Sequence, residues 1–149
     1  MRKWMGVAVA VLAITAVTAG AAFASTPGSV QVTLTSPKVF QGKGHSANIT
    51  CGSKNGVYVA KFGRTTPNHV TFKGALTVRG YTGAGDYRGR LTVFAHAPGR
   101  TVAATVAGIR VSLTENGGKS SFSRTLPGII YPKLAGKVLA GTVTWTCAT

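Results

Sequence analysis

The chain has few side chains that could carry out acid, base or metal chemistry. Its 149 residues include three histidines, His45, His69 and His96, and two carboxylates, Asp86 and Glu115. The histidines are not closely spaced, unlike most sequence-encoded zinc ligands. Glycoside hydrolysis would require both carboxylates at one defined separation. The sequence therefore favours a non-enzymatic protein without a cofactor or a bound metal, and a secreted hydrolase remains the less favoured alternative.

Two motifs of nucleotide and ester chemistry are also missing. The glycine-rich stretch 83–89 matches neither phosphate-loop pattern, and no helical periodicity follows it to supply a helix N-terminus. Gly-x-Ser-x-Gly does not occur in the chain. The glycines of 83–89 therefore predict a loop between strands.

The most promising binding residues are two tyrosines and two arginines. Tyr81 and Tyr87 flank the glycine-rich loop, and Arg88 and Arg90 follow on one face of the next predicted strand. Tyrosine beside arginine suits an anionic polymer, a glycan ring or a protein partner. Alternatively, the tyrosines cover one end of the fold and the arginines are merely solvated.

The N-terminus has the features of an export signal. Arg2 and Lys3 form a basic region, 7–17 is apolar, and Ala22-Phe23-Ala24 matches a cleavage site before Ser25. We therefore expect a signal peptide at 1–24, a single domain at 25–149, and a location in the cell envelope or outside the cell. An uncleaved leader acting as a membrane anchor is the alternative.

The charge of the chain indicates an anionic partner. Seventeen lysines and arginines stand against two carboxylates, and removal of the leader lowers the formal net charge from +15 to +13. Such a domain attracts anionic cell-wall polymers and other polyanions. A protein partner is also compatible, whereas no specific nucleic acid is predicted, and membrane contact is expected only through an uncleaved leader.

The two cysteines, Cys51 and Cys147, predict one disulfide. Export would place them in an oxidising compartment, where an even count favours pairing. Each one ends an alternating run: Ala47 and Ile49 share a face with Cys51, and Val143 and Trp145 share one with Cys147. A metal or redox pair of thiols is less favoured because no CxxC spacing is present.

The remaining pattern is typical of an all-β protein. Short runs rich in valine, isoleucine and threonine alternate with Gly, Pro and Asn-Gly turns, and sustained helical periodicity is absent. We expect an antiparallel β-sandwich with an immunoglobulin-like architecture and one disulfide, its strand order left open. Two pairs of short strands are expected at 69–81 and 101–113, interrupted at Lys73-Gly74 and Ala107-Gly108.

Three segments carry a resemblance to a known family. The stretches Ile49-Thr50-Cys51-Gly52, Gly80-Tyr81-Thr82-Gly83 and Gly141-Thr142-Val143-Thr144-Trp145-Thr146-Cys147, with the leader, resemble small exported actinobacterial proteins. Among these, the mycobacterial lipoprotein antigens with a C-terminal cysteine strand are similar in layout. This chain has no cysteine at the cleavage site for lipid attachment. The resemblance implies a secreted or envelope protein without catalytic residues, and a structural surface antigen with no specific ligand is the alternative to a binding protein.

Overall fold

The computed structural model describes residues 26–66 and 69–149, so that the predicted signal peptide at 1–24 lies outside the described residues. No helix within the described ranges has the length and apolar character needed to cross a membrane. The described residues form nine strands and the short 3-10 helices η1 (Lys38–Phe40) and η3 (Pro132–Leu134). The strands are β1 (Ser29–Ser36), β2 (Gly42–Ser46), β3 (Ile49–Lys54), β4 (Val57–Thr65), β5 (Thr71–Arg79), β6 (Gly85–Ala97), β7 (Arg100–Thr114), β8 (Gly117–Thr125) and β9 (Val138–Thr146).

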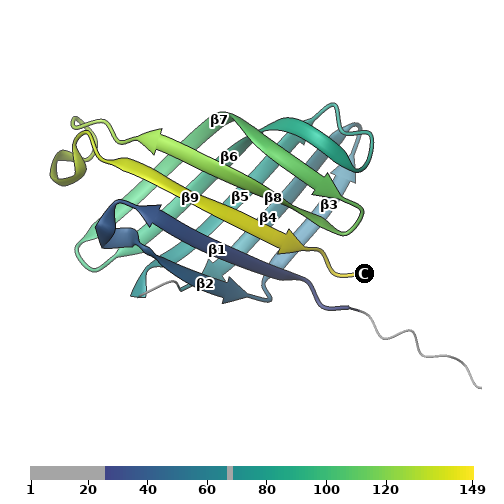
Figure 1. Ribbon diagram of the computed structural model, residues 1–149, viewed down its shortest axis with the longest axis horizontal. Coiled ribbons are helices and arrows are strands. Elements are labelled where there is room, and N and C mark those ends of the chain that lie inside the picture. The colour runs from purple at the N-terminus through teal and green to yellow at the C-terminus, as the bar shows by residue number, and fades with distance from the viewer. Residues whose placement is uncertain (1–25, 67–68) are drawn as a thin grey trace, which may run out of the picture.

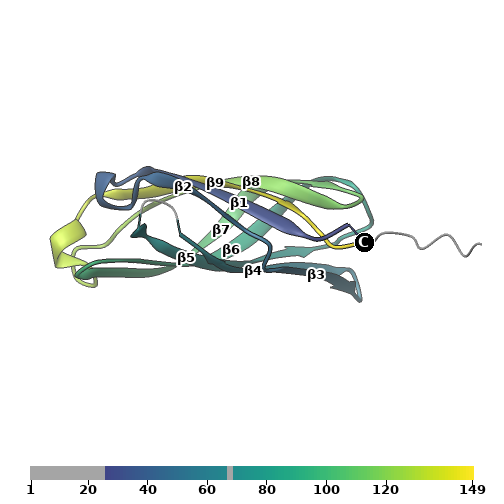
Figure 2. The ribbon, with the colours of Figure 1, turned by 90° about the horizontal axis from the view of Figure 1, so that it is seen from below.

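All nine strands belong to one antiparallel sheet, in the order β2-β1-β9-β8-β7-β6-β5-β4-β3. The sheet folds over on itself, so that β2, β1, β9 and β8 face the strands β3 to β6 (Figures 1 and 2). The sheet bends over between β7 and β8, and these two strands pair only over Val111–Thr114 and Gly117–Ser120. The all-β class and antiparallel pairing are confirmed. The immunoglobulin-like architecture is not confirmed, because one continuous sheet supplies both layers.

The interior is filled by side chains that alternate along the strands. On β1, Val30, Val32 and Leu34 are buried, whereas Gln31 is exposed, as expected for a sheet with one face on the core and the other in solvent. Every strand except the two edge strands, β2 and β3, supplies at least one buried apolar side chain. Because area removed from water stabilises by roughly 25 cal/mol per Å², the seven inner strands hold the fold together and the edges add little.

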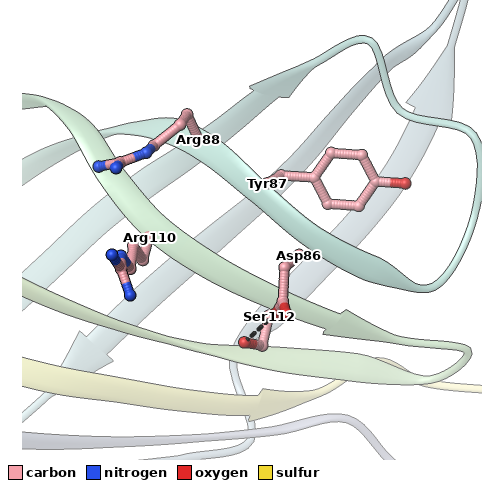
Figure 3. Close-up of a pocket in the computed structure, with 5 residues that line it drawn as sticks. All are labelled: Asp86, Tyr87, Arg88, Arg110 and Ser112. Carbon is pink, nitrogen blue, oxygen red and sulfur yellow. Dashed lines mark hydrogen bonds between the residues drawn. The ribbon is translucent and has the colours of Figure 1, made fainter.

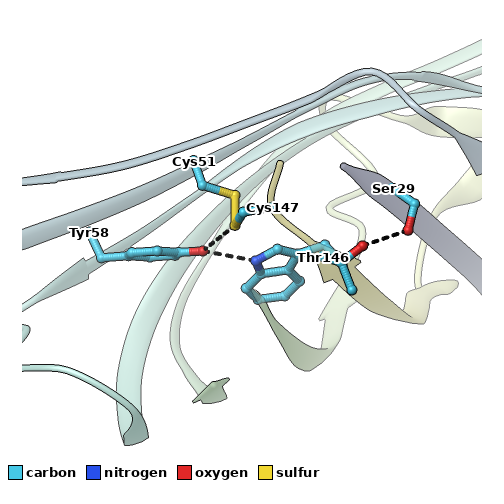
Figure 4. The surroundings of a disulfide bond; sticks show 6 residues. Ser29, Cys51, Tyr58, Thr146 and Cys147 are labelled. Carbon is cyan, nitrogen blue, oxygen red and sulfur yellow. Dashed lines mark hydrogen bonds between the residues drawn. A yellow bond between two sulfur atoms is a disulfide. The ribbon is translucent and has the colours of Figure 1, made fainter. Parts of the chain in front are cut away.

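The disulfide joins the edge strand β3 to the end of β9, the third strand from the opposite edge of the sheet. Cys51 on β3 is bonded to Cys147, just after β9, and the two sulfurs are 2.04 Å apart. Beside it, Nε1 of Trp145 donates a 2.9 Å hydrogen bond to the hydroxyl of Tyr58, which lies 3.5 Å from Sγ of Cys147 (Figure 4). The predicted disulfide is therefore confirmed, with Trp145 packed next to it. The bond is compatible with an oxidising, extracellular location.

A second junction lies where β7 and β8 diverge. The first half of β7 pairs only with β6, which leaves backbone groups facing an open seam. The hydroxyl of Tyr131 accepts from the amide of Ala103 and donates to its carbonyl, and Arg124 donates a 2.8 Å hydrogen bond to the carbonyl of Thr105. These two side chains substitute for the missing strand and satisfy backbone groups that would otherwise be unpaired.

Three strand boundaries differ from the sequence-based expectation. The segment around Lys73-Gly74 does not interrupt β5, and β7 runs through Ala107-Gly108 as one strand with a bulge. The alternating run through Ala47, Ile49 and Cys51 is not one strand, because a turn at Ala47-Asn48 separates β2 from β3. In the first two cases the glycine lies inside a strand and does not end it, as is found where backbones approach closely.

Loss of the disulfide should destabilise the protein strongly. We expect the double variant Cys51→Ala/Cys147→Ala to lose roughly 2–5 kcal/mol of unfolding free energy, because the bond closes a 96-residue separation in the unfolded chain. Denaturant unfolding of the variant measures the loss, and reduced wild-type protein should match it. The intact mass should rise by two hydrogens on reduction. Two free thiols in freshly exported protein would contradict the pairing.

The Tyr131 hydroxyl should protect the seam. Tyr131→Phe removes both hydrogen bonds to Ala103, and we expect a loss of about 0.5–1.5 kcal/mol of stability with faster hydrogen exchange at the Ala103 amide. Tyr81→Phe is the matched control, because the structure gives the Tyr81 hydroxyl no hydrogen bond. If hydrogen exchange at the Ala103 amide is unchanged in Tyr131→Phe, the Tyr131 hydroxyl does not protect this amide and the prediction is wrong.

Candidate functional site

The outer surface of β5, β6 and β7 carries four arginines. Along β6, Gly89 and Leu91 are buried and alternate with the exposed Arg88 and Arg90. Arg79 ends β5 and Arg110 lies on β7, and both are exposed on the same outer surface. We call Arg79, Arg88, Arg90 and Arg110 the arginine face.

The register brings two of these arginines directly together. Arg88 is paired opposite Arg110 in the β6–β7 ladder, and Arg90 is paired opposite Thr77 of β5. Directly opposite residues are roughly 5 Å apart between Cα atoms, and residues two apart on a strand about 6.8 Å. Like charges directly opposite each other in a sheet are unfavourable. The pairing of Arg88 with Arg110 therefore costs stability unless an anion lies between them.

A bulge in β7 places Arg110 on this surface. Before the bulge, Val102 and Val106 point into the core; after it, Ile109 and Val111 do. The extra residue is Gly108, whose φ of 68° is a conformation that glycine adopts without strain. Without the inserted residue, alternation would turn Arg110 towards the core. The bulge thus converts a buried position into an exposed arginine.

The bulge also helps to form a surface hollow of about 400 Å³. Its lining includes Arg79, Arg88 and Arg90, together with Gly89 and Gly108. A Cβ at Gly89 would meet Val111 at 2.8 Å and the Thr77 carbonyl at 3.1 Å, so a side chain does not fit there. Nη1 of Arg88 donates a 2.8 Å hydrogen bond to the Gly108 carbonyl, which fixes this guanidinium at the hollow.

A neighbouring hollow of about 420 Å³ holds Arg88 and Arg110 together with Asp86 (Figure 3). The carboxylate accepts a 2.5 Å hydrogen bond from the hydroxyl of Ser112. It forms no salt bridge with either arginine, and the part of the chain that the structure describes contains no salt bridge. Asp86 therefore offsets only part of the positive charge of this hollow.

Of the two predicted tyrosines, Tyr87 lines this second hollow, although its ring lies on the other side of β6, and Tyr81 does not line it. Tyr87 points away from Arg88 and Arg110 in Figure 3 and shares the side of Gly89 and Leu91. Its hydroxyl donates a 2.8 Å hydrogen bond to the Gly83 carbonyl. The ring of Tyr81 lies between the rings of Tyr58 and Tyr87, with centroids at 5.2 and 5.9 Å. The tyrosines therefore cover one end of the core, while Arg88 and Arg90 face solvent.

Sequence reasoning identified Arg88 and Arg90 but not the other half of the arginine face. Arg79 and Arg110 are distant in sequence and meet Arg88 only through strand pairing. The sequence does indicate the direction of Arg79, because alternation along the strand places it on the same face as the exposed Lys73. No comparable signal existed for Arg110, because its direction depends on the bulge at Gly108.

The histidines are distributed over separate elements. His45 lies on β2, His69 precedes β5, and His96 on β6 places Nδ1 at 2.7 Å from the Thr101 hydroxyl. The described residues contain no cluster of three or more potential metal ligands and no free cysteine. What the described geometry brings together is arginine, serine and backbone, which is a set of groups suited to anion binding.

An antiparallel all-β protein with a basic outer surface is thus defined by fold and site together. Comparisons with protein-family models, curated proteins and solved structures give no match to the chain. The resemblance to mycobacterial lipoprotein antigens stays a prediction.

Two tyrosines have shifted ionisation. Burial raises the pKa of Tyr58 above its ordinary value of 10.0, although the indole N–H of Trp145 opposes this and Tyr81 adds to it. The pKa of Tyr87 is lowered, chiefly because the hydroxyl and the amide of Thr82 form hydrogen bonds with its phenolic oxygen. The two rings therefore differ in ionisation although both cover the same end of the core.

These shifts predict the order of tyrosine ionisation. In an alkaline ultraviolet titration we expect Tyr87 to ionise before Tyr58, and Tyr87→Phe and Tyr58→Phe to remove the early and late steps respectively. Since the folded-state pKa of Tyr58 is raised, its contribution to stability is present below pH 10.0 and is lost as pH rises through the folded value. A Tyr58 step that precedes the Tyr87 step would contradict the assigned environments.

Proposed function

We propose that the protein is an exported, non-enzymatic binding protein that holds an anionic polymer on its arginine face. The observation that carries the proposal is the pairing of Arg88 opposite Arg110, with Arg79 and Arg90 beside them and no salt bridge to either. An anion placed between the guanidinium groups would convert mutual repulsion into charge-assisted hydrogen bonding. The export that the leader sequence predicts, and the net charge of +13 expected without the leader, favour the same proposal.

The shape of the site favours a polymer over a small ligand. Two adjoining shallow hollows share Arg88, and the second adjoins a third that is lined by Arg110 and Lys119. The cations follow one another at strand spacings of roughly 5–7 Å, so that successive anionic groups along a chain could each meet a cation. Phosphate groups suit the planar fork of arginine, and phosphate-bearing wall polymers are the class that we favour.

The same geometry argues against a platform for nucleic acid bases. Tyr87 lines the hollow of Arg88 and Arg110, but its ring turns away from both arginines and packs against Tyr81. Phe94 does lie on the outer surface, but Nζ of Lys73 covers its ring at 4.8 Å from the centroid. Binding of single strands relies on exposed aromatic rings beside cations. We therefore expect recognition by charge and spacing.

The central prediction separates binding from stability at the arginine face. Arg110→Ser should weaken binding of teichoic acid or heparin while stability stays equal or rises by about 0.2–1 kcal/mol, because like-charge repulsion with Arg88 is relieved. Arg88→Ser/Arg110→Ser should weaken binding by roughly tenfold or more, at on the order of 1 kcal/mol for each charged contact. Isothermal titration at low salt and thermal unfolding measure the two effects.

The control is Arg64→Ser/Arg100→Ser, which removes the same charge from two exposed arginines outside the arginine face. Wild-type affinity should fall steeply as salt increases, because screening acts within a Debye length of about 8 Å at physiological ionic strength. Equal losses in both double variants would mean that the charge acts diffusely and that no site exists. If the wild type binds no polyanion at low salt, the proposal is wrong, and a structural surface antigen becomes the better account.

A further inference from the structure

The loop between β8 and β9, residues 126–137, exposes two large apolar side chains. Ile129 is 97% exposed and Ile130 is 65% exposed, and they are the only large hydrophobic residues of the described chain that are exposed in this way. We call residues 126–137 the isoleucine loop. It projects at one extremity of the molecule, at the end opposite the C-terminus (Figure 1). Two adjacent isoleucines in water at a loop tip require a physical reason, since isolated exposed apolar residues are ordinary but a projecting pair is a contact surface.

The loop is ordered by its own contacts. The amide of Leu126 donates a 2.8 Å hydrogen bond to the Lys137 carbonyl, and the amide of Gly136 donates a 3.1 Å hydrogen bond to the Leu126 carbonyl. Leu126 and Leu134 are buried, and the Tyr131 hydroxyl is hydrogen-bonded to the backbone of Ala103 on β7. The two isoleucines therefore stand on a fixed base, which holds them outward.

The charge around the loop is of one sign. A shallow hollow beside the tip is lined by Ile130, Tyr131, Arg100 and Lys133, and Lys137 closes the base of the loop. Lys38 in η1 lies at the same end of the sheet, because β1 ends beside the start of β9.

Both carboxylates lie at the opposite end of the sheet. Asp86 is paired with Ser112, and Glu115 follows the last residue of β7, whereas Arg100 is the first. The 15 residues of β7 span roughly 45–50 Å, several times the screening length. The end that carries the isoleucine loop is therefore purely cationic.

We propose that this end of the molecule binds an anionic lipid surface, with Ile129 and Ile130 inserted among the acyl chains and Arg100 and Lys133 at the headgroups. A projecting apolar tip surrounded by cations matches the two components of interfacial binding, apolar burial and attraction to negative headgroups. A protein partner would require a complementary pocket around a convex tip, and cations alone do not argue for one. Membrane contact thus arises from the folded domain, whereas the sequence alone suggested only the leader.

Binding to lipid vesicles tests the proposal. Wild type and all variants are produced in the same way, so that a leader, if it is retained, contributes equally to the binding of each. With phosphatidylglycerol-containing vesicles, Ile129→Ser/Ile130→Ser should bind at least about tenfold more weakly than wild type, and Ile129→Leu/Ile130→Leu within about twofold of it. Arg100→Ser/Lys133→Ser should lose about fivefold for each charge on these vesicles and nothing on phosphatidylcholine vesicles.

A local probe separates the loop from any other membrane contact. In Ile129→Cys, with the native disulfide intact, an environment-sensitive fluorophore should shift to the blue on anionic vesicles, whereas the same probe at Thr92→Cys on the outer surface of β6 should not. No shift at position 129, or equal binding by Ile129→Ser/Ile130→Ser and wild type, overturns the proposal. If vesicles take up no protein and the serine variant instead abolishes a dimer in solution, the loop is an interface between two copies. Polymer binding by the arginine face is measured separately on these variants and should not change.

Discussion

The structure depends on holding together the two ends of a single folded sheet. A continuous sheet that turns back on itself buries its inner face only while both halves stay in contact, and its edge strands, β2 and β3, add no fully buried apolar side chains. The Cys51–Cys147 bond ties β3 to the end of β9, and the hydrogen bond from Trp145 to Tyr58 joins β9 to β4 beside it. Covalent and polar contacts thus secure the end of the sheet where burial contributes least.

The packed interior directs function to the outside of the sheet. Large side chains such as Phe40, Phe72 and Leu139 are fully buried and fill the space between the two layers. The hollows around the arginines lie on the outer surface and owe their form to one inserted glycine, Gly108, in β7. The bulge exposes Arg110 and bends the strand near the place where the sheet turns over, so that site and fold share one local irregularity.

Sequence alone predicted the features that depend on local alternation. Trp145 and Cys147 share a face in a run of alternating residues, and Asn55-Gly56 forms a hairpin turn with positive φ at both residues. The single folded sheet could not be predicted, because the pairing of β1 with β9 joins segments about a hundred residues apart. Arg110 was missed for a different reason: a one-residue insertion reverses the direction of all following side chains, and composition does not reveal it. The contacts at the seam could not be predicted either, because Tyr131 and Arg124 form hydrogen bonds there with backbone groups of β7, which is distant in sequence.

The short edge strands have a consequence for solubility. Unpaired edges of a sheet are templates onto which another chain can add a strand and begin an aggregate. Here the two edges have five and six residues, meet at the turn Ala47-Asn48, and carry Lys43 and Lys54. At the seam between β7 and β8, Tyr131 and Arg124 engage backbone groups of Ala103 and Thr105 on β7. A neighbouring copy would meet short edges and a strong positive charge, so that we expect little fibril-like association at high concentration even though the protein is made largely of strands.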